Sequence, residues 1–111
     1  MSVRLSKKNK GLKILFVAPE ASPFVKVGGL GEVMYSLPKA LREIGHDARV
    51  MIPKYSSIDS AKFSMSMVEK SLFVPIGENA GGSEGHMICN VKKFLDPDNG
   101  QAVTYLLENE E

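Results

Sequence analysis

The chain has 111 residues, which is enough for one domain with a modest hydrophobic core. Apolar residues make up 43% of it and charged residues 24%, as in an ordinary globular protein, and the formal charge of +1 argues against non-specific nucleic-acid binding as the main role. A single cysteine, Cys89, excludes an internal disulfide, and no run approaches the ~20 apolar residues of a membrane span.

The first segment, residues 1–11, is polar and carries four basic side chains. This composition predicts a solvated, flexible tail, and the absence of an apolar run within it is unlike a secretory signal peptide. Together with the lone cysteine, it predicts a cytoplasmic protein, or a plastid one if the source is a plant and a transit peptide has been removed. We expect residues 12–111 to form the folded part.

Residues 12–18 read LKILFVA, a short apolar run that is typical of a central parallel strand. Pro19 and Pro23 end this strand and predict an extended or turned path for the connection that follows. That connection continues to the glycines at 28 and 29, beyond the usual ~2–6 residues of a strand-to-helix loop. Extra length at this place favours a binding role.

A helix is predicted from about residue 30 to residue 44. Six apolar side chains recur there at intervals of three and four, which predicts one stripe facing a sheet: Leu30, Val33, Met34, Leu37, Leu41 and Ile44. Pro38 lies inside the pattern, where it removes one backbone hydrogen bond and predicts a bend costing roughly 3 kcal/mol if unrelieved. Gly45 is suited to the C-terminal cap.

Residues 48–53 form a second apolar strand, so strand, helix and strand predict a right-handed parallel βαβ unit. Residues 55–66 are polar and serine-rich, with a short helix as one alternative. Three further strands are expected, with a glycine-rich stretch at 77–85 and an Asn-Gly turn at 99–100 between them: residues 71–76, 86–94 and 102–107.

These elements predict an α/β, Rossmann-like fold that starts with a βαβ unit and continues as a β-meander or hairpin and a further strand. One helix cannot cover both faces of such a sheet. We therefore expect part of a larger domain, with apolar sheet surface left uncovered unless the chain self-associates.

The stretch at residues 26–33 reads KVGGLGEV and lies at the start of the predicted helix. A helix N-terminus presents free N–H groups and the positive end of the helix dipole, which suits a phosphate, and Lys26 adds an ammonium. No Ser, Thr or Asp stands at the cap position to occupy these donors. The pattern predicts an anion site, although Lys26 alone could be a solvated lysine and Gly28 and Gly29 could serve a positive φ.

Two common phosphate-binding motifs do not fit. The P-loop spacing is absent, and a dinucleotide fingerprint counted from Gly29 has Met34 at its third glycine position. The second strand ends in Pro53-Lys54-Tyr55 rather than in an acidic residue that could bind a ribose. A nucleotide-dependent dehydrogenase is therefore disfavoured.

The segment 13–33, KILFVAPEASPFVKVGGLGEV, closely resembles the N-terminus of bacterial glycogen synthases and plant starch synthases. The resemblance continues through residues 37–41, which include Pro38, and through residues 45–53, and it is looser from residue 72 to residue 109. Residues 103–109 resemble the third parallel strand of that family.

This resemblance implies the N-terminal portion of a GT-B glycosyltransferase, which transfers glucose with retention from ADP-glucose or UDP-glucose to the 4-OH of an α-1,4-glucan. Lys26 matches the family lysine that contacts the donor phosphates and sugar, and Gly28 and Gly29 match the turn against the donor pyrophosphate. Glu20 and Glu32 match acidic positions of the cleft, although the family commonly has Asp where this chain has Glu32, and Ala or Gly at position 31. We take Lys26, Glu20 and Glu32 as the catalytic candidates.

The chemistry requires no metal or other cofactor, and His86 and Cys89 are interpreted as packing residues. Much of the nucleotide grip belongs to a C-terminal domain of the family, so we expect this chain alone to be inactive. The expected partners are the nucleotide sugar, the glucan and that domain, with no nucleic acid or membrane. The alternative is a non-catalytic module that binds glucan or nucleotide weakly, or associates with itself.

Overall fold

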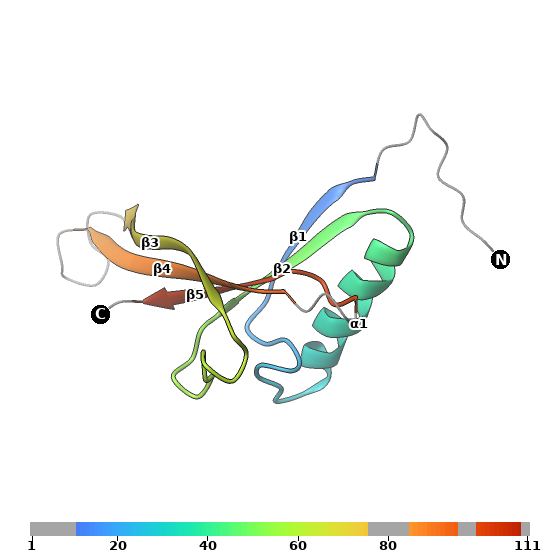
Figure 1. The fold of residues 1–111 in the computed structure, drawn as a ribbon, viewed down its shortest axis with the longest axis horizontal. Helices are drawn as coiled ribbons and strands as arrows, with labels where there is room; N and C mark the ends of the chain where they lie inside the picture. The colour runs from blue at the N-terminus through green and yellow to red at the C-terminus, as the bar shows by residue number, and fades with distance from the viewer. Residues whose placement is uncertain (1–10, 76–84, 96–99, 110–111) are drawn as a thin grey trace.

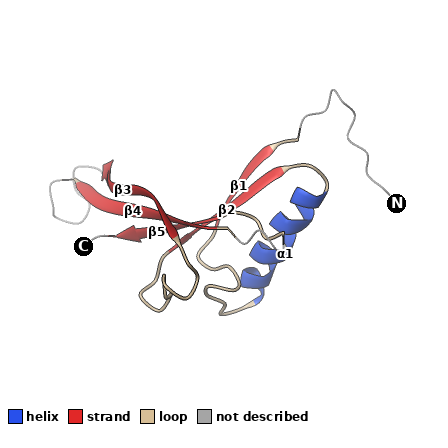
Figure 2. Cartoon of the chain, in the orientation of Figure 1, coloured by secondary structure: helices blue, strands red, loops and turns tan. Residues whose placement is uncertain are grey.

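The computed structural model describes residues 11–75, 85–95 and 100–109. The described residues form one five-stranded sheet and one helix, whose elements in chain order are β1 (Lys13–Val17), α1 (Gly29–Glu43), β2 (Asp47–Pro53), β3 (Ser66–Pro75), β4 (His86–Phe94) and β5 (Thr104–Asn109). The strand order is β1-β2-β5-β4-β3 (Figures 1 and 2). The predicted basic tail, except Gly11, and most of the glycine-rich stretch lie outside the described residues.

The sheet is mixed, as the sequence predicted. β1 pairs with β2 and β2 with β5, both in parallel, which confirms the parallel βαβ unit and the third parallel strand. β4 then pairs with β5 and with β3 in antiparallel fashion, which confirms the meander. The β3–β4 hairpin extends away from α1 (Figure 1).

Three predictions from the sequence differ from the structure: the start of β3, the bounds of β5, which runs over Thr104–Asn109 rather than 102–107, and a short helix within residues 55–66. β3 begins at Ser66 rather than at residue 71. Its pairing with β4 shifts register twice, and Ser71 has a φ of 56°. These irregularities interrupt the alternating pattern by which a strand is recognised in the sequence. The short helix offered as an alternative for residues 55–66 does not form, and that segment consists mainly of turns before β3 begins.

Helix α1 ends as predicted. Gly45 has a φ of 101°, its N–H donates to the Arg42 carbonyl, and the N–H of His46 donates to the Leu41 carbonyl. This pair of bonds is a Schellman cap, which favours glycine because of the positive φ.

The predicted apolar stripe of α1 is only partly buried. α1 continues through Pro38, whose ring is buried, and Gly31 is buried as well. Four members of the stripe are instead between 39% and 45% exposed: Leu30, Val33, Leu37 and Ile44. The helix therefore meets the sheet along a narrower face than the periodicity predicted, and keeps an apolar flank in contact with solvent.

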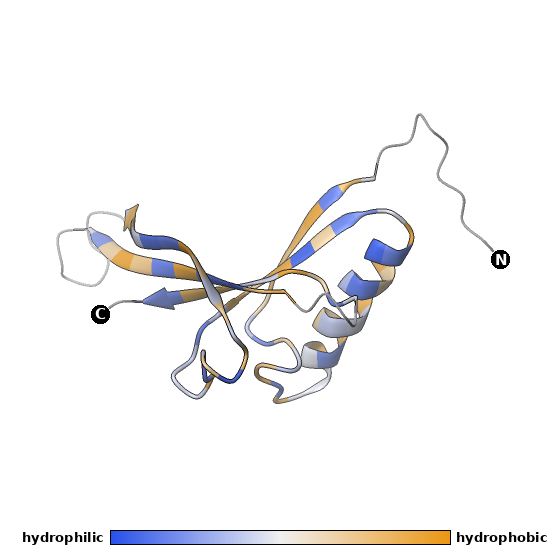
Figure 3. Ribbon diagram, in the orientation of Figure 1, coloured by the Kyte–Doolittle hydropathy of each residue, from blue (hydrophilic) through white to orange (hydrophobic). Residues whose placement is uncertain are grey.

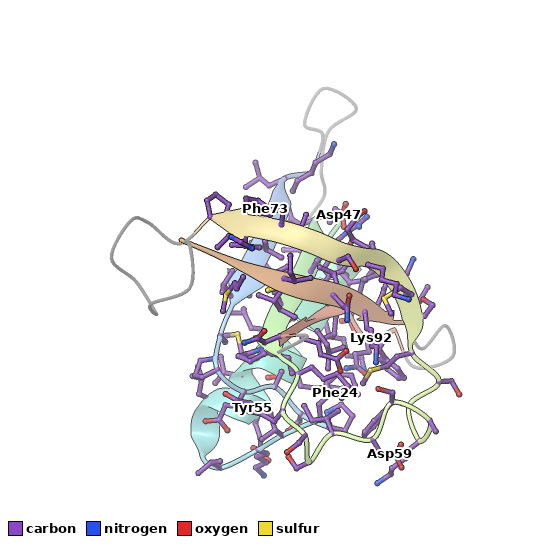
Figure 4. All side chains as sticks on the ribbon, turned by 90° about the vertical axis from the view of Figure 1, so that its left-hand side faces the viewer. Phe24, Asp47, Tyr55, Asp59, Phe73 and Lys92 are labelled. Atoms are coloured by element: carbon purple, nitrogen blue, oxygen red, sulfur yellow. The ribbon has the colours of Figure 1, made fainter. Side chains whose placement is uncertain are left out.

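The hydrophobic core joins the parallel strands to two loops. Val50, Ile52 and Leu106 are at most 1% exposed, and they cluster with Ala21 and Phe24 from the loop after β1. The ring of Phe24, which is labelled in Figure 4, lies 4.8 Å from the Phe63 ring and 5.1 Å from the Phe94 ring, measured between centroids. The loop before the glycines is thus anchored in the core.

A polar cluster links the parallel and antiparallel parts of the sheet. The Glu108 carboxylate lies 3.3 Å from the Lys54 ammonium and 3.5 Å from that of Lys92, and it accepts from the Asn90 amide. Burial disfavours its charged form, but the donors from Asn90 and Lys54 outweigh this and the pKa of Glu108 lies below its ordinary value.

The opposite face of the parallel strands is uncovered in the described part of the chain, as the sequence predicted. Leu15 is 53% exposed and Val17 is 73% exposed, although both belong to a largely hydrophobic strand (Figure 3). A shallow hollow of about 350 Å³ lies at the carboxyl ends of these strands, lined by Val17, Ala18, Pro19, Met51, Ile52, Pro53 and Leu107.

Leu106→Ala tests the location of the core. Leu106 is fully buried, so we expect this variant to lose about 2–5 kcal/mol of unfolding free energy in urea titrations followed by circular dichroism. Leu12 is 62% exposed, and Leu12→Ala should change stability by less than about 0.5 kcal/mol. Equal losses in the two variants would contradict the assigned core.

Candidate functional site

The site is built on the loop between β1 and α1. Ala21 and Phe24 are buried, and Ala21 pairs with Val25 across a tight turn. The Ser22 N–H donates to the Gly31 carbonyl at 3.0 Å, and the Tyr55 hydroxyl donates to the Pro19 carbonyl at 2.8 Å. These contacts tie the loop both to the start of the helix and to the segment after β2.

Glu20 reaches the backbone just before the helix. Its Oε2 accepts from the N–H of Val27 at 2.6 Å and from the N–H of Gly28 at 3.2 Å. These hydrogen bonds, with a further contribution from the Gly31 N–H, lower the pKa of Glu20. The sequence has no Ser, Thr or Asp at the cap position, but the Glu20 carboxylate, seven residues before Val27, accepts from some of the free N–H groups at the start of the helix.

Lys26 and Glu32 form an ion pair through the Lys26 ammonium and Glu32 Oε1. The hydrogen bond from Lys26 lowers the pKa of Glu32. The two side chains are 50% and 66% exposed, so water screens their attraction and the ammonium remains accessible to another anion.

Gly28 and Gly29 are not required by the conformation of the chain. Gly28 is extended, with φ −149° and ψ −159°, and Gly29 opens the helix without a positive φ. The conformational explanation for these two glycines is therefore wrong. A Cβ placed on either residue would meet nothing within 4 Å, so internal packing does not require glycine there.

Gly31, unlike Gly28 and Gly29, lies close to other parts of the chain. A Cβ at this position would lie 3.0 Å from Glu20 Oε2 and 3.2 Å from Lys26 Cγ. The sequence analysis missed these contacts, because only the fold brings Glu20 and Lys26 against the first turn of α1. Gly31 is buried, whereas Gly28 and Gly29 are exposed.

All five predicted site residues thus lie at one junction of loop and helix. Glu20 contacts the backbone at Val27 and Gly28, and Glu32 contacts Lys26. Pro19, which precedes Glu20, also lines the hollow at the carboxyl ends of the strands, where open α/β sheets bind ligands.

His86 and Cys89 both lie on β4. His86 stacks on Phe73 at a centroid distance of 4.5 Å, and Cys89 is buried. Across the described ranges, no three His, Cys, Asp or Glu side chains are grouped so that they could hold a metal ion. In the same ranges, no helix has the length and apolar character needed to span a membrane.

Comparison with solved structures defines the class of fold. The chain superposes on the catalytic domain of starch synthase IV from Arabidopsis thaliana, bound to ADP and acarbose, with a TM-score of 0.74. Sequence identity is 22%, and the match covers 92% of this chain and 19% of that one. The fold is that of the N-terminal Rossmann-like domain of a GT-B glycosyltransferase.

Sequence comparison then defines the family. The family profile described as the starch synthase catalytic domain matches residues 13–111, so the chain belongs to this family. It is 68% identical over 90 residues to a glycogen synthase of Clostridium acetobutylicum, covering 78% of this chain. It is also 39% identical over 101 residues to a glycogen synthase of Clostridium perfringens, covering 91% of this chain. The chain spans only 19% of the length of each relative.

A matched pair of alanine variants tests the different roles of the glycines. Gly31→Ala should be less stable than Gly29→Ala, because its Cβ would lie 3.0 Å from Glu20 Oε2 and that side chain would have to give way, whereas Gly29→Ala should stay within about 0.5 kcal/mol of the wild type or above it. Thermal unfolding followed by circular dichroism measures both. A loss with Gly29→Ala and none with Gly31→Ala would refute the assignment.

Proposed function

We propose that this chain is the opening part of the N-terminal domain of a glycogen synthase, which transfers glucose with retention from ADP-glucose or UDP-glucose to the non-reducing end of an α-1,4-glucan. The family assignment and the glycogen synthase relatives support this proposal. Residues 12–111 would belong to that single partial domain, preceded by a tail at 1–11, and the protein would work in the cytoplasm, or in a plastid if it comes from a plant.

The observation that carries the proposal is the open space beside Gly28 and Gly29. Neither a positive φ nor a neighbouring atom explains glycine at these positions. A ligand that must approach the backbone closely does explain it, because a side chain there would keep the ligand away. The pyrophosphate and glucose of a nucleotide sugar are such a ligand, and ADP is the nucleotide named in the structure of the Arabidopsis relative.

The residues present fit the chemistry of the leaving group. When the bond between glucose and the nucleoside diphosphate breaks, negative charge develops on the phosphate oxygens. Fixed backbone N–H groups and a lysine ammonium stabilise that charge in the transition state. Lys26 would leave Glu32 for the donor phosphate, an exchange that the exposure of their ion pair permits.

The acidic residues have separate places in this proposal. Glu32 is the partner of Lys26 in the absence of donor and forms part of the cleft wall. Glu20 lies against Gly31 and accepts from the Val27 N–H. The rest of the nucleotide contacts and the glucan cleft would require the C-terminal domain of the family.

The alternative is a non-catalytic module that binds nucleotide or glucan weakly, or associates with itself. The uncovered face of β1, with Leu15 and Val17 exposed, is the observation that favours self-association. Sedimentation of the chain across a range of concentrations distinguishes a self-associating module from a monomer.

Calorimetric titration with ADP-glucose tests the donor site. We expect weak binding that Lys26→Ala abolishes, because the ammonium is the only side-chain cation proposed to contact the phosphates. Lys39 lies on α1, the helix that follows Lys26, and its ammonium packs over the Tyr35 ring, so Lys39→Ala is the matched control and should bind like the wild type. Unchanged binding by Lys26→Ala would contradict the proposal.

The chain by itself should not turn over substrate, because half of the cleft lies outside it. Purified chain incubated with radiolabelled ADP-glucose and glycogen should give incorporation at the level of a blank. Steady incorporation that scales with chain concentration would show that these 111 residues are catalytically complete, against our expectation.

A further inference from the structure

Glu20 has a geometry that differs from that of the other candidate site residues. Its carboxylate oxygen Oε2 lies within 3.2 Å of two backbone nitrogens, those of Val27 and Gly28. The same oxygen would be 3.0 Å from a Cβ on Gly31, so it is pressed against the first turn of α1. Gly28, in contrast, has nothing within 4 Å on its Cβ side.

Val27 and Gly28 lie directly between Lys26 and the helix. The N–H groups at this place have no partner within a helix, and no side chain caps Gly28 from its own position. Without Glu20, both N–H groups would turn toward water and the two peptide planes would be free to rotate. The carboxylate therefore fixes the orientation of the segment that carries Lys26 at one end and Gly29 at the other.

We propose that Glu20 is a positioning residue, whose carboxylate holds the 26–31 segment through the N–H groups of Val27 and Gly28 without contacting the nucleotide sugar. This inference rests on the proposed donor site, which it deepens. It separates Glu20 from Lys26, the group proposed to contact the phosphates, and it favours a small residue at Gly31, where a Cβ would lie 3.0 Å from the carboxylate oxygen.

The structure also defines how protonation acts on this contact. The pKa of Glu20 is lowered by the two N–H donors first and by the charge of Lys26 last, and Lys26 is itself paired with Glu32. A carboxyl group with a lowered pKa keeps its hydrogen bonds above its ordinary pKa of about 4.3 and loses them as the pH falls through the lowered value. The positioning effect is therefore complete at neutral pH.

The first test uses the whole 111-residue chain without ligand. In proton–nitrogen NMR spectra, the Val27 and Gly28 amide signals should shift together in a single acid titration with a midpoint below 4.3, the ordinary glutamate pKa. Glu20→Gln should remove that titration, and Glu32→Gln, the matched control, should leave it in place. Titration of both amides that persists in Glu20→Gln would overturn the proposal.

The second test measures ADP-glucose binding by calorimetry at pH 7. Glu20→Gln keeps one acceptor oxygen, so we expect affinity to fall about 3- to 10-fold, with a larger fall in Glu20→Ala. Tighter binding by both variants would mean that Glu20 occupies the donor's own place, and an equal loss in both would mean that its charge contacts the donor. Either result overturns the proposal.

The two tests keep the two proposals apart. Absence of ADP-glucose binding by folded wild-type chain counts against the donor site, while the acid titration still decides the contact between Glu20 and the two N–H groups. If Glu20→Ala does not fold, the wild-type titration and Glu20→Gln supply the decision.

Discussion

The burial of Phe24 is the constraint on which the rest of the site depends. The connection between β1 and α1 is longer than most strand-to-helix loops, and long loops are ordinarily more mobile than the elements that they join. Phe24 inserts into the core instead, against Phe63 from the loop after β2 and Phe94 at the end of β4. Segments from three parts of the chain thus share one aromatic cluster, and the chain emerges from it only two residues before Lys26.

The second level of order is electrostatic, and it is arranged around that anchor. Two carboxylates face the loop but act on different groups: Glu20 on backbone N–H groups and Glu32 on the Lys26 ammonium. The contact of Glu20 lies beside Gly31 and engages peptide groups of the backbone. The contact of Glu32 is an ion pair between exposed side chains, which water screens. A fixed backbone with a lysine that can exchange partners is the combination that suits an arriving phosphate.

Much of this was predictable from local sequence. The apolar run at residues 13–17, the Gly45 cap and the parallel order of β1, β2 and β5 follow from periodicity and turn chemistry. Lys26, Gly28 and Gly29 were proposed from a single stretch, whereas Glu20 and Glu32 were proposed from the family resemblance. The two glycines were then given a conformational alternative that their negative φ values exclude.

What could not be predicted depends on contacts between distant residues. Nothing in the spacing of Glu20 from Val27 indicates a hydrogen bond, because the intervening chain must first turn through the buried Phe24. The early start of β3 was hidden by its register shifts against β4. The burial of the apolar stripe of α1 was overestimated. The buried residues of this helix are Pro38 and Gly31, which a count of hydrophobic residues leaves out.

The exposed apolar side chains of β1 and α1 limit the free energy that this chain gains by folding. In a sheet with parallel strands both faces are normally buried, since crossover helices lie on each side. Here Leu15 and Val17 on β1, and Leu37 on α1, remain between 42% and 73% exposed within the described residues. β1 and β2 pair in register from Lys13 to Val17, so the sheet keeps its alignment, but the exposed side chains forgo part of the free energy that their burial would contribute, roughly 1.5–3 kcal/mol for each one fully buried. Any element that covered Leu15 and Val17 on β1 would therefore stabilise the βαβ unit, and with it the core contacts of Phe24 that hold the Lys26 loop.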